Sequence, residues 1–247
     1  MFQPRRYRSW VKSGDLVSFR IVENETDLLI SVDKSAPLEA VRRAVRDSVS
    51  YHRARLKEYI SRSPEFLSSL SPVDPLEGAP EIALRMIEAA RRAGVGPMAA
   101  VAGAIAELVG EDLLRLCREV IVENGGDIFI KASKPRLVGL YAGGSPFTGR
   151  IAFKIDPEET PLGVCTSSGT VGHSLSFGAA DSVTVFSESA ALADAAATAI
   201  GNLISSPRDI ERGIQLAKSI KGVRGVAIVV GDRIGIWGDV EIVKTEG

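Results

Sequence analysis

Near the N-terminus, alternating apolar and polar residues predict two β-strands. Leu16 to Val22 and Asp27 to Val32 are rich in β-branched residues, and we expect a hairpin in which residues 23–26 form a four-residue turn. From Leu38 to about Tyr59 the apolar positions recur at helical spacing, which predicts a long amphipathic helix over one face of that hairpin. Four prolines then make residues 61–80 a connector with room for a turn of helix.

Beyond residue 80 the pattern first predicts helices and then mostly strands. Helices are expected at Glu81–Ala93, ended by Gly94, and at Ala99–Val109, ended by Gly110, with a further turn at Asp112–Leu116. Two more helices are expected at Ala190–Ile204 and Asp209–Ile220. The predicted strands are Glu119–Glu123, Asp127–Lys131, Arg136–Tyr141, Arg150–Ile155, Leu162–Cys165, Ser182–Phe186, Gly225–Val230, Ile234–Trp237 and Val240–Val243.

This order of elements favours an α+β fold: a layered domain of mainly antiparallel β-sheet packed with helices, rather than a doubly wound parallel sheet. We expect residues 1–247 to form one domain. In this interpretation the β-hairpin and the long helix occupy residues 1–60, and the proline-rich connector occupies residues 61–80.

Composition narrows the class of protein. The 247 residues are 45% hydrophobic and 25% charged, and 30 basic residues nearly balance 31 acidic ones. These values are typical of a globular protein and provide no global basic field for nucleic acid. Cys117 and Cys165 stand apart in apolar surroundings, so we expect core residues rather than a disulfide or zinc site. Neither a signal peptide nor a membrane span is recognisable, which predicts a cytoplasmic protein with no membrane partner.

One segment combines hydroxyls and glycines without any charge. Between Thr160 and Ala180 no residue is charged, and backbone N–H groups in such a loop can converge on an anion such as a phosphate. A solvated surface loop is the alternative interpretation. His173 is its only side chain that titrates near neutrality, although an isolated histidine also serves as a hydrogen-bonding fixture. The candidate residues are Thr166, Ser167, Ser168, Gly169, Thr170, Gly172, His173 and Ser174.

The helix that follows is apolar except for one stripe. Asp194 is the only charge from 190 to 204, and Thr198 and Asn202 follow at i+4 and i+8 on the same side. A carboxylate, a hydroxyl and an amide oxygen in a row suit Mg²⁺ or Ca²⁺. Alternatively, the dipole of its own helix stabilises Asp194, and Thr198 bonds back to the carbonyl of residue 194.

These segments carry a resemblance to a known family. Ser182 to Phe186 followed by Ala191-Leu192-Ala193-Asp194-Ala195-Ala196-Ala197-Thr198-Ala199 resembles the C-terminal signature of the ApbE family, the FAD-dependent protein FMN transferases. Thr166-Ser167-Ser168-Gly169 resembles that family's Thr-Ser-Gly turn, and Asn124-Gly125-Gly126-Asp127-Ile128 resembles its Asn-x-Gly-Gly-Asp turn. The fuller string from Gly163 to Ser174 is similar to the UPF0280 (DUF375) subgroup of ApbE-like proteins, and this likeness covers most of the chain.

The resemblance implies an ApbE-like fold and a set of site residues. Asp194 and Thr198 would bind Mg²⁺ (or Ca²⁺), His173 would act in catalysis, and FAD or a related nucleotide would be the ligand. Asn124, Gly125, Gly126 and Asp127 would join the residues of the polar loop in binding it. The family's helix start recurs here as Ala102-Gly103-Ala104-Ile105-Ala106-Glu107, with Glu107 in place of a lysine.

Three functions follow from these observations. The first is Mg²⁺-dependent transfer of FMN from FAD to a Thr or Ser of an acceptor protein. The second is non-catalytic flavin or nucleotide binding, and the third is an interaction protein that docks a partner through residues 61–80 and the arginine-rich helix. For the first two we expect residues 166–176 and Asp194 to converge on one pocket.

Overall fold

The largest element of the molecule is an eight-stranded sheet in which every strand pair is antiparallel. In the computed structural model, which describes residues 14–169 and 178–245, the strand order is β1-β2-β3-β4-β7-β8-β9-β10. These strands are β1 (Leu16–Glu23), β2 (Thr26–Asp33), β3 (Val120–Asn124), β4 (Asp127–Lys131), β7 (Leu162–Ser167), β8 (Ser182–Ser187), β9 (Val223–Val230) and β10 (Arg233–Gly238). A smaller sheet, in the order β11-β6-β5, contains β5 (Arg136–Gly139), β6 (Ile151–Ile155) and β11 (Glu241–Lys244).

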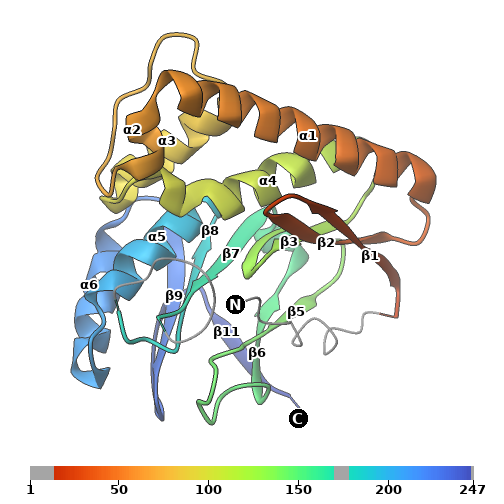
Figure 1. The fold of residues 1–247 in the computed structure, drawn as a ribbon. Helices are drawn as coiled ribbons and strands as arrows, with labels where there is room; N and C mark the ends of the chain where they lie inside the picture. Colours follow the sequence, from red (N-terminus) through yellow and green to blue (C-terminus); the bar gives the residue numbers. More distant parts are fainter. Residues whose placement is uncertain (1–13, 170–177, 246–247) are drawn as a thin grey trace.

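Helices and the small sheet pack on opposite faces of the large sheet (Figure 1). Successive residues of a strand point to opposite faces, so Val183 and Val185 join the core under the helices while Phe186 joins the core between the two sheets. The predicted layered α+β architecture is therefore confirmed. The helices are α1 (Leu38–Arg62), α2 (Pro64–Ser68), α3 (Glu81–Ala93), α4 (Val101–Leu113), α5 (Ala190–Leu203) and α6 (Ile210–Ser219).

The predicted N-terminal hairpin forms, but its turn is shorter than expected. Glu23 and Thr26 face each other as the last pair of the ladder, which leaves only Asn24 and Glu25 in the turn. Asn24 has a φ of 52°, a left-handed conformation that asparagine tolerates better than most residues. The prediction of a four-residue turn at 23–26 was wrong because Glu23 and Thr26 extend the strands.

The long helix and the connector pack against each other. Val41, Val45 and Val49 of α1 are buried at helical spacing, as the sequence indicates. The short helix α2 begins at the connector's first proline, and its buried Phe66 meets Tyr59 edge to face, with ring centroids 5.2 Å apart. The connector is thereby anchored to the last turns of α1.

One predicted helix end was wrong. α4 runs through Gly110 to Leu113, and a short 3-10 helix at Pro97–Ala100 precedes it. Gly110 is needed for packing rather than for ending the helix, because a Cβ atom there would lie 2.1 Å from Cδ1 of Phe129 on β4. In the described part of the chain no single helix is long and apolar enough to cross a membrane. α3 and residues 97–113 pass that test only as a pair, and they are bent by 105° at their break.

Candidate functional site

The polar stripe of α5 lies on its least buried side. Of residues 190–202, only Asp194, Thr198 and Asn202 are partly exposed, and every other residue is buried. The helix begins after Ser189, whose Oγ accepts the Leu192 N–H at 3.3 Å. An alanine-rich helix with one polar stripe therefore presents a carboxylate, a hydroxyl and an amide along a single line.

Asp194 contacts the N-terminus of a different helix. Its Oδ2 accepts the Gly103 N–H at 2.9 Å, and the Ala102 N–H also favours its ionised form, so the carboxylate caps the first turn of α4. Burial by the surrounding protein outweighs these bonds and raises the pKa of Asp194 to about 7. The helix dipole that stabilises this carboxylate is that of α4, rather than that of its own helix.

A second carboxylate faces Asp194 from the turn between β3 and β4. Gly125 and Gly126 have φ values of 75° and 127°, which favour glycine, and Asn124 Nδ2 donates to the Ala102 carbonyl at 3.1 Å. Asp127, the first residue of β4, has a pKa raised well above its ordinary value by burial and by the nearby Asp194 charge. The turn thus places a second acidic group near Asp194, which caps the start of α4.

The end of β7 contributes alternating side chains. Cys165 faces the helices: its Sγ lies 3.3 Å from the Ala190 carbonyl oxygen, and the same thiol is within hydrogen-bond reach of Asp127, an interaction that lowers the pKa of that carboxyl. Thr166 points to the opposite face of the sheet, where its hydroxyl bonds to that of Thr184 at 2.9 Å. The backbone N–H of Thr166 donates to the Gly126 carbonyl at 3.2 Å, and it also favours the ionised form of Asp127, which lowers the pKa of that carboxyl.

The polar loop leaves and rejoins the fold at one point. Gly169 donates its N–H to the Ala180 carbonyl at 2.9 Å, and a Cβ at Gly169 would lie 1.9 Å from the carbonyl oxygen of Gly178. Gly178 in turn packs against the Gly201 carbonyl near the end of α5. The predicted site residues Thr170, Gly172, His173 and Ser174 lie outside the described residues.

The structure therefore brings together the Asn124–Asp127 turn, Cys165, the Thr166 backbone and Asp194. The two ends of the polar loop, Gly169 and Gly178, lie near the C-terminal end of the polar stripe on α5. Ser167 is buried on the helix side of β7. Within the described ranges no group of three or more His, Cys, Asp or Glu is arranged to hold a metal ion. A cation here would depend on two carboxylates, a hydroxyl, water and the ligand's own oxygens, which is a set that suits Mg²⁺.

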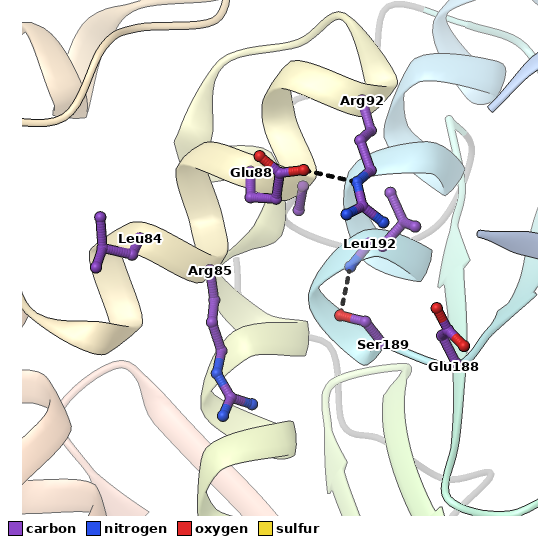
Figure 2. A pocket seen from close by; sticks show the side chains of 8 residues that line it. Leu84, Arg85, Glu88, Arg92, Glu188, Ser189 and Leu192 are labelled. Atoms are coloured by element: carbon purple, nitrogen blue, oxygen red, sulfur yellow. Dashed lines mark hydrogen bonds and ion pairs between the residues drawn. The ribbon is translucent and has the colours of Figure 1, made fainter. Parts of the chain in front are cut away.

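A separate pocket opens between α3 and the start of α5 (Figure 2). Its volume is about 420 Å³, and none of the predicted site residues lines it. Its walls combine leucines with paired charges, such as Glu88 and Arg92. The lining residues are Leu84, Arg85, Glu88, Ala89, Arg92, Glu188, Ser189 and Leu192.

Sequence reasoning missed the contribution of α4. Gly103 supplies the N–H that binds Asp194, and a Cβ there would lie 2.2 Å from the Ala190 carbonyl, so the two helices touch at this glycine. Glu107, one turn further along α4, is buried and accepts hydrogen bonds from the first turn of α5. A signal for Glu107 was present, because it is the only charged residue between Arg92 and Glu111.

The chain is similar in sequence to known proteins over most of its length. A family model described as "AbpE bacteria" matches residues 8–225. A UPF0280 protein of Methanocaldococcus jannaschii is 45% identical over 234 residues, which cover 92% of this chain and 93% of the relative. A UPF0280 protein of Methanopyrus kandleri is 45% identical over 229 residues, with 90% and 91% of the two chains covered.

Solved structures show the same fold at much lower identity. The apo flavinyl transferase ApbE of Pseudomonas stutzeri superposes with a TM-score of 0.55 at 14% identity, over 90% of this chain and 94% of that one. The ApbE protein of Thermotoga maritima gives a TM-score of 0.56 at 13% identity, over 89% and 96% of the two chains. These likenesses confirm the predicted fold and carry no information on individual side chains.

Proposed function

Because the chain belongs to the UPF0280 family of ApbE-like proteins, we propose that it binds a flavin nucleotide, FAD or a close relative, together with Mg²⁺, and that it transfers FMN to a hydroxyl of an acceptor protein. The fold of the flavin transferases that it resembles supports a flavin-related role. The specific reaction rests on the residues themselves.

The observation that carries the proposal is the pair of carboxylates at the start of α4. Asp127 and Asp194 are close enough for the charge of one to raise the pKa of the other, and neither forms an ion pair with a basic side chain of the described residues. Two crowded acids of this kind are stabilised by a hard divalent cation. Thr198, one turn along the stripe, offers a further oxygen ligand.

Each residue then has a defined task. Asp194 would hold the cation while Gly103 fixes its Oδ2, and Thr198 and Asp127 would complete the protein's share of the ligands. Bound Mg²⁺ would neutralise the pyrophosphate charge of the nucleotide. The backbone of the Gly125-Gly126 turn lies beside the two carboxylates, where the absence of side chains leaves room for a phosphate.

In the transfer step, the acceptor hydroxyl oxygen forms a bond to the phosphorus of the FMN half while the bond to the AMP half breaks. AMP leaves with the electron pair of that bond. His173 is assigned to accept the proton of the hydroxyl. This role requires the imidazole to come within about 3 Å of the acceptor oxygen, or within one bridging water.

The test is to incubate the purified protein with FAD, with and without Mg²⁺, and to measure bound flavin by fluorescence and released AMP by chromatography. We expect Mg²⁺-dependent flavin binding in the wild type and its loss in Asp194→Asn. Glu211→Gln is the matched control, because it makes the same carboxyl-to-amide change on the exposed side of α6.

Each result has a distinct meaning. Flavin that binds without release of AMP, even with a Thr- or Ser-containing acceptor, would make this a non-catalytic flavin-binding protein. If AMP does appear, His173→Ala should slow its release by a factor of about 100 with little change in flavin affinity. Equal flavin binding by the wild type and Asp194→Asn would remove Asp194 from the proposed metal site.

A further inference from the structure

Glu107 connects three elements at the start of α5. Its Oε2 accepts the Ser189 hydroxyl and the Ala191 N–H, each at 2.9 Å, and its Oε1 accepts from Arg85 of α3 at 3.0 Å. The side chain is only 9% exposed. Arg85 is in turn bonded to Glu81 and Glu111, so one guanidinium is surrounded by three carboxylates.

Two carboxylates, one on each helix, thereby accept hydrogen bonds from the N-terminal N–H groups of the other helix. Glu107 belongs to α4 and caps the N-terminus of α5, whereas Asp194 belongs to α5 and caps the N-terminus of α4. Gly103 and Ala190 touch between these two caps. Because the first turn of a helix carries unpaired N–H groups and a partial positive charge, each carboxylate also restrains the position of the other helix.

We propose that Glu107 is a positioning residue for the cation site: by fixing the first turn of α5 against α4, it sets the place where Asp194 meets the Gly103 N–H and the cation. This inference rests on the proposed function. Glu107 itself points to α3 and to Ser189, one turn before Asp194, and it touches no candidate ligand of the cation. Removing groups that orient a metal ligand typically weakens metal binding by 10- to 100-fold.

The test compares Glu107→Ala with Glu111→Ala. Both variants remove a carboxylate from Arg85, but the Glu111 carboxylate bonds to Arg85 and, among the described residues, not to α5, so it serves as the matched control. We expect Glu107→Ala to weaken Mg²⁺ binding, measured by calorimetry with the metal alone, by about tenfold. Glu107→Gln, which keeps an oxygen acceptor for the Ala191 N–H, should lose about threefold, and Glu111→Ala should bind like the wild type.

Amide hydrogen exchange without metal provides the second readout. In Glu107→Ala we expect faster exchange at Ala191, which loses its acceptor, and also at Gly103, whose acceptor is Asp194. Amides of the core strand β9 report any general loss of stability and should not change to the same extent. If Glu107→Ala does not fold, Glu107→Gln answers the same questions with smaller changes.

The outcomes separate the two proposals. Wild-type Mg²⁺ affinity in a folded Glu107→Ala or Glu107→Gln protein would overturn the positioning role, and so would unchanged exchange at Gly103. If the wild type itself binds no Mg²⁺, the proposed function fails. In that case the exchange at Gly103 still decides whether Glu107 positions the cap that Asp194 provides.

Discussion

Asp194 shows how one carboxylate can join two helices and carry a raised pKa. Burial opposes its ionisation, while the Gly103 and Ala102 N–H groups favour it, and burial is the larger effect. The neighbouring Asp127 has its pKa raised for the same reason, with the Asp194 charge added. A divalent cation would reverse this balance, because it favours the ionised form of both groups.

This balance predicts a pH dependence of stability. The folded state raises the pKa of Asp194 from about 3.8 to about 7, so the folded state holds this proton more tightly than the unfolded chain. The resulting stabilisation is complete below pH 4 and is lost as the pH rises through 7. Without metal, the free energy of unfolding of Asp194→Asn relative to the wild type should therefore increase by roughly 1–3 kcal/mol between pH 5 and pH 8.

Urea unfolding at both pH values, in the presence of a chelator, measures this difference. Subtracting the free energies of unfolding of the two proteins at each pH removes the contribution of other titrating groups. One such group is Glu119, whose pKa is lowered because the Arg136 and Ser133 hydrogen bonds outweigh its burial. A difference that stays constant from pH 5 to pH 8 would show that Asp194 does not titrate in this range. Saturating Mg²⁺ should reduce the difference at pH 8, since only the wild type would bind it well.

At the scale of elements, α5 owes its position to glycines on its neighbours. A Cβ on Gly163 of β7 would lie 2.4 Å from the Ala190 Cα, and a Cβ on Gly103 of α4 would lie 2.2 Å from the Ala190 carbonyl oxygen. The start of α5 is therefore held between a strand and a helix by direct backbone contact. This close approach brings Asp194 and Glu107 within reach of the helix ends that they cap.

We predict that Gly163→Ala destabilises the protein by about 2 kcal/mol, because the methyl group meets backbone atoms that cannot rotate away. Gly139→Ala is the matched control, since Gly139 also lies in a strand and a Cβ there would have no heavy atom within 4 Å. Denaturant unfolding measures both variants. Equal stabilities of the two variants would show that the start of α5 can shift without cost.

At the scale of the whole molecule, one core runs beneath all the large helices. It joins Phe19 of β1, Val49 of α1, Ala104 of α4, Ile200 of α5 and Val230 of β9 in one cluster of buried residues. We therefore predict a single cooperative unfolding transition. Far-ultraviolet circular dichroism and tryptophan fluorescence, to which Trp237 on β10 contributes, should report the same midpoint, and two separated transitions would indicate that the parts fold independently.

Local patterns predicted most of the elements, because turns and alternation are properties of neighbouring residues. Asp127–Lys131 has the predicted bounds, since the two glycines before it form a tight turn. Gly110 was misread because its role depends on Phe129, a residue of another element. The pairing of β4 with β7 makes Asp127 and Cys165 neighbours although β5 and β6 lie between these strands in the chain, and periodicity does not report such long-range pairing.

Local sequence patterns predicted less of the candidate site than of the fold, because the site is built from residues that are distant in the chain. The stripe at Asp194 follows from helical spacing, but its partner helix does not, and Glu107 was named only within the segment that resembles the family's helix start. The orientation of Thr166 followed from strand alternation once Cys165 was known to face the helices. The hydroxyls of Thr166 and Ser167, both predicted site residues, thus lie on opposite faces of β7.

The close contact between Gly169 and Gly178 has a consequence for sequence variation at this junction. A Cβ on Gly169 would lie 1.9 Å from the Gly178 carbonyl oxygen, and a Cβ on Gly178 would lie 1.9 Å from the Gly201 carbonyl oxygen at the end of α5. Backbone atoms cannot rotate away as the end of a side chain can, so any side chain at either position would force this junction apart. The sheet and α5 therefore meet here at a point that only glycine can occupy.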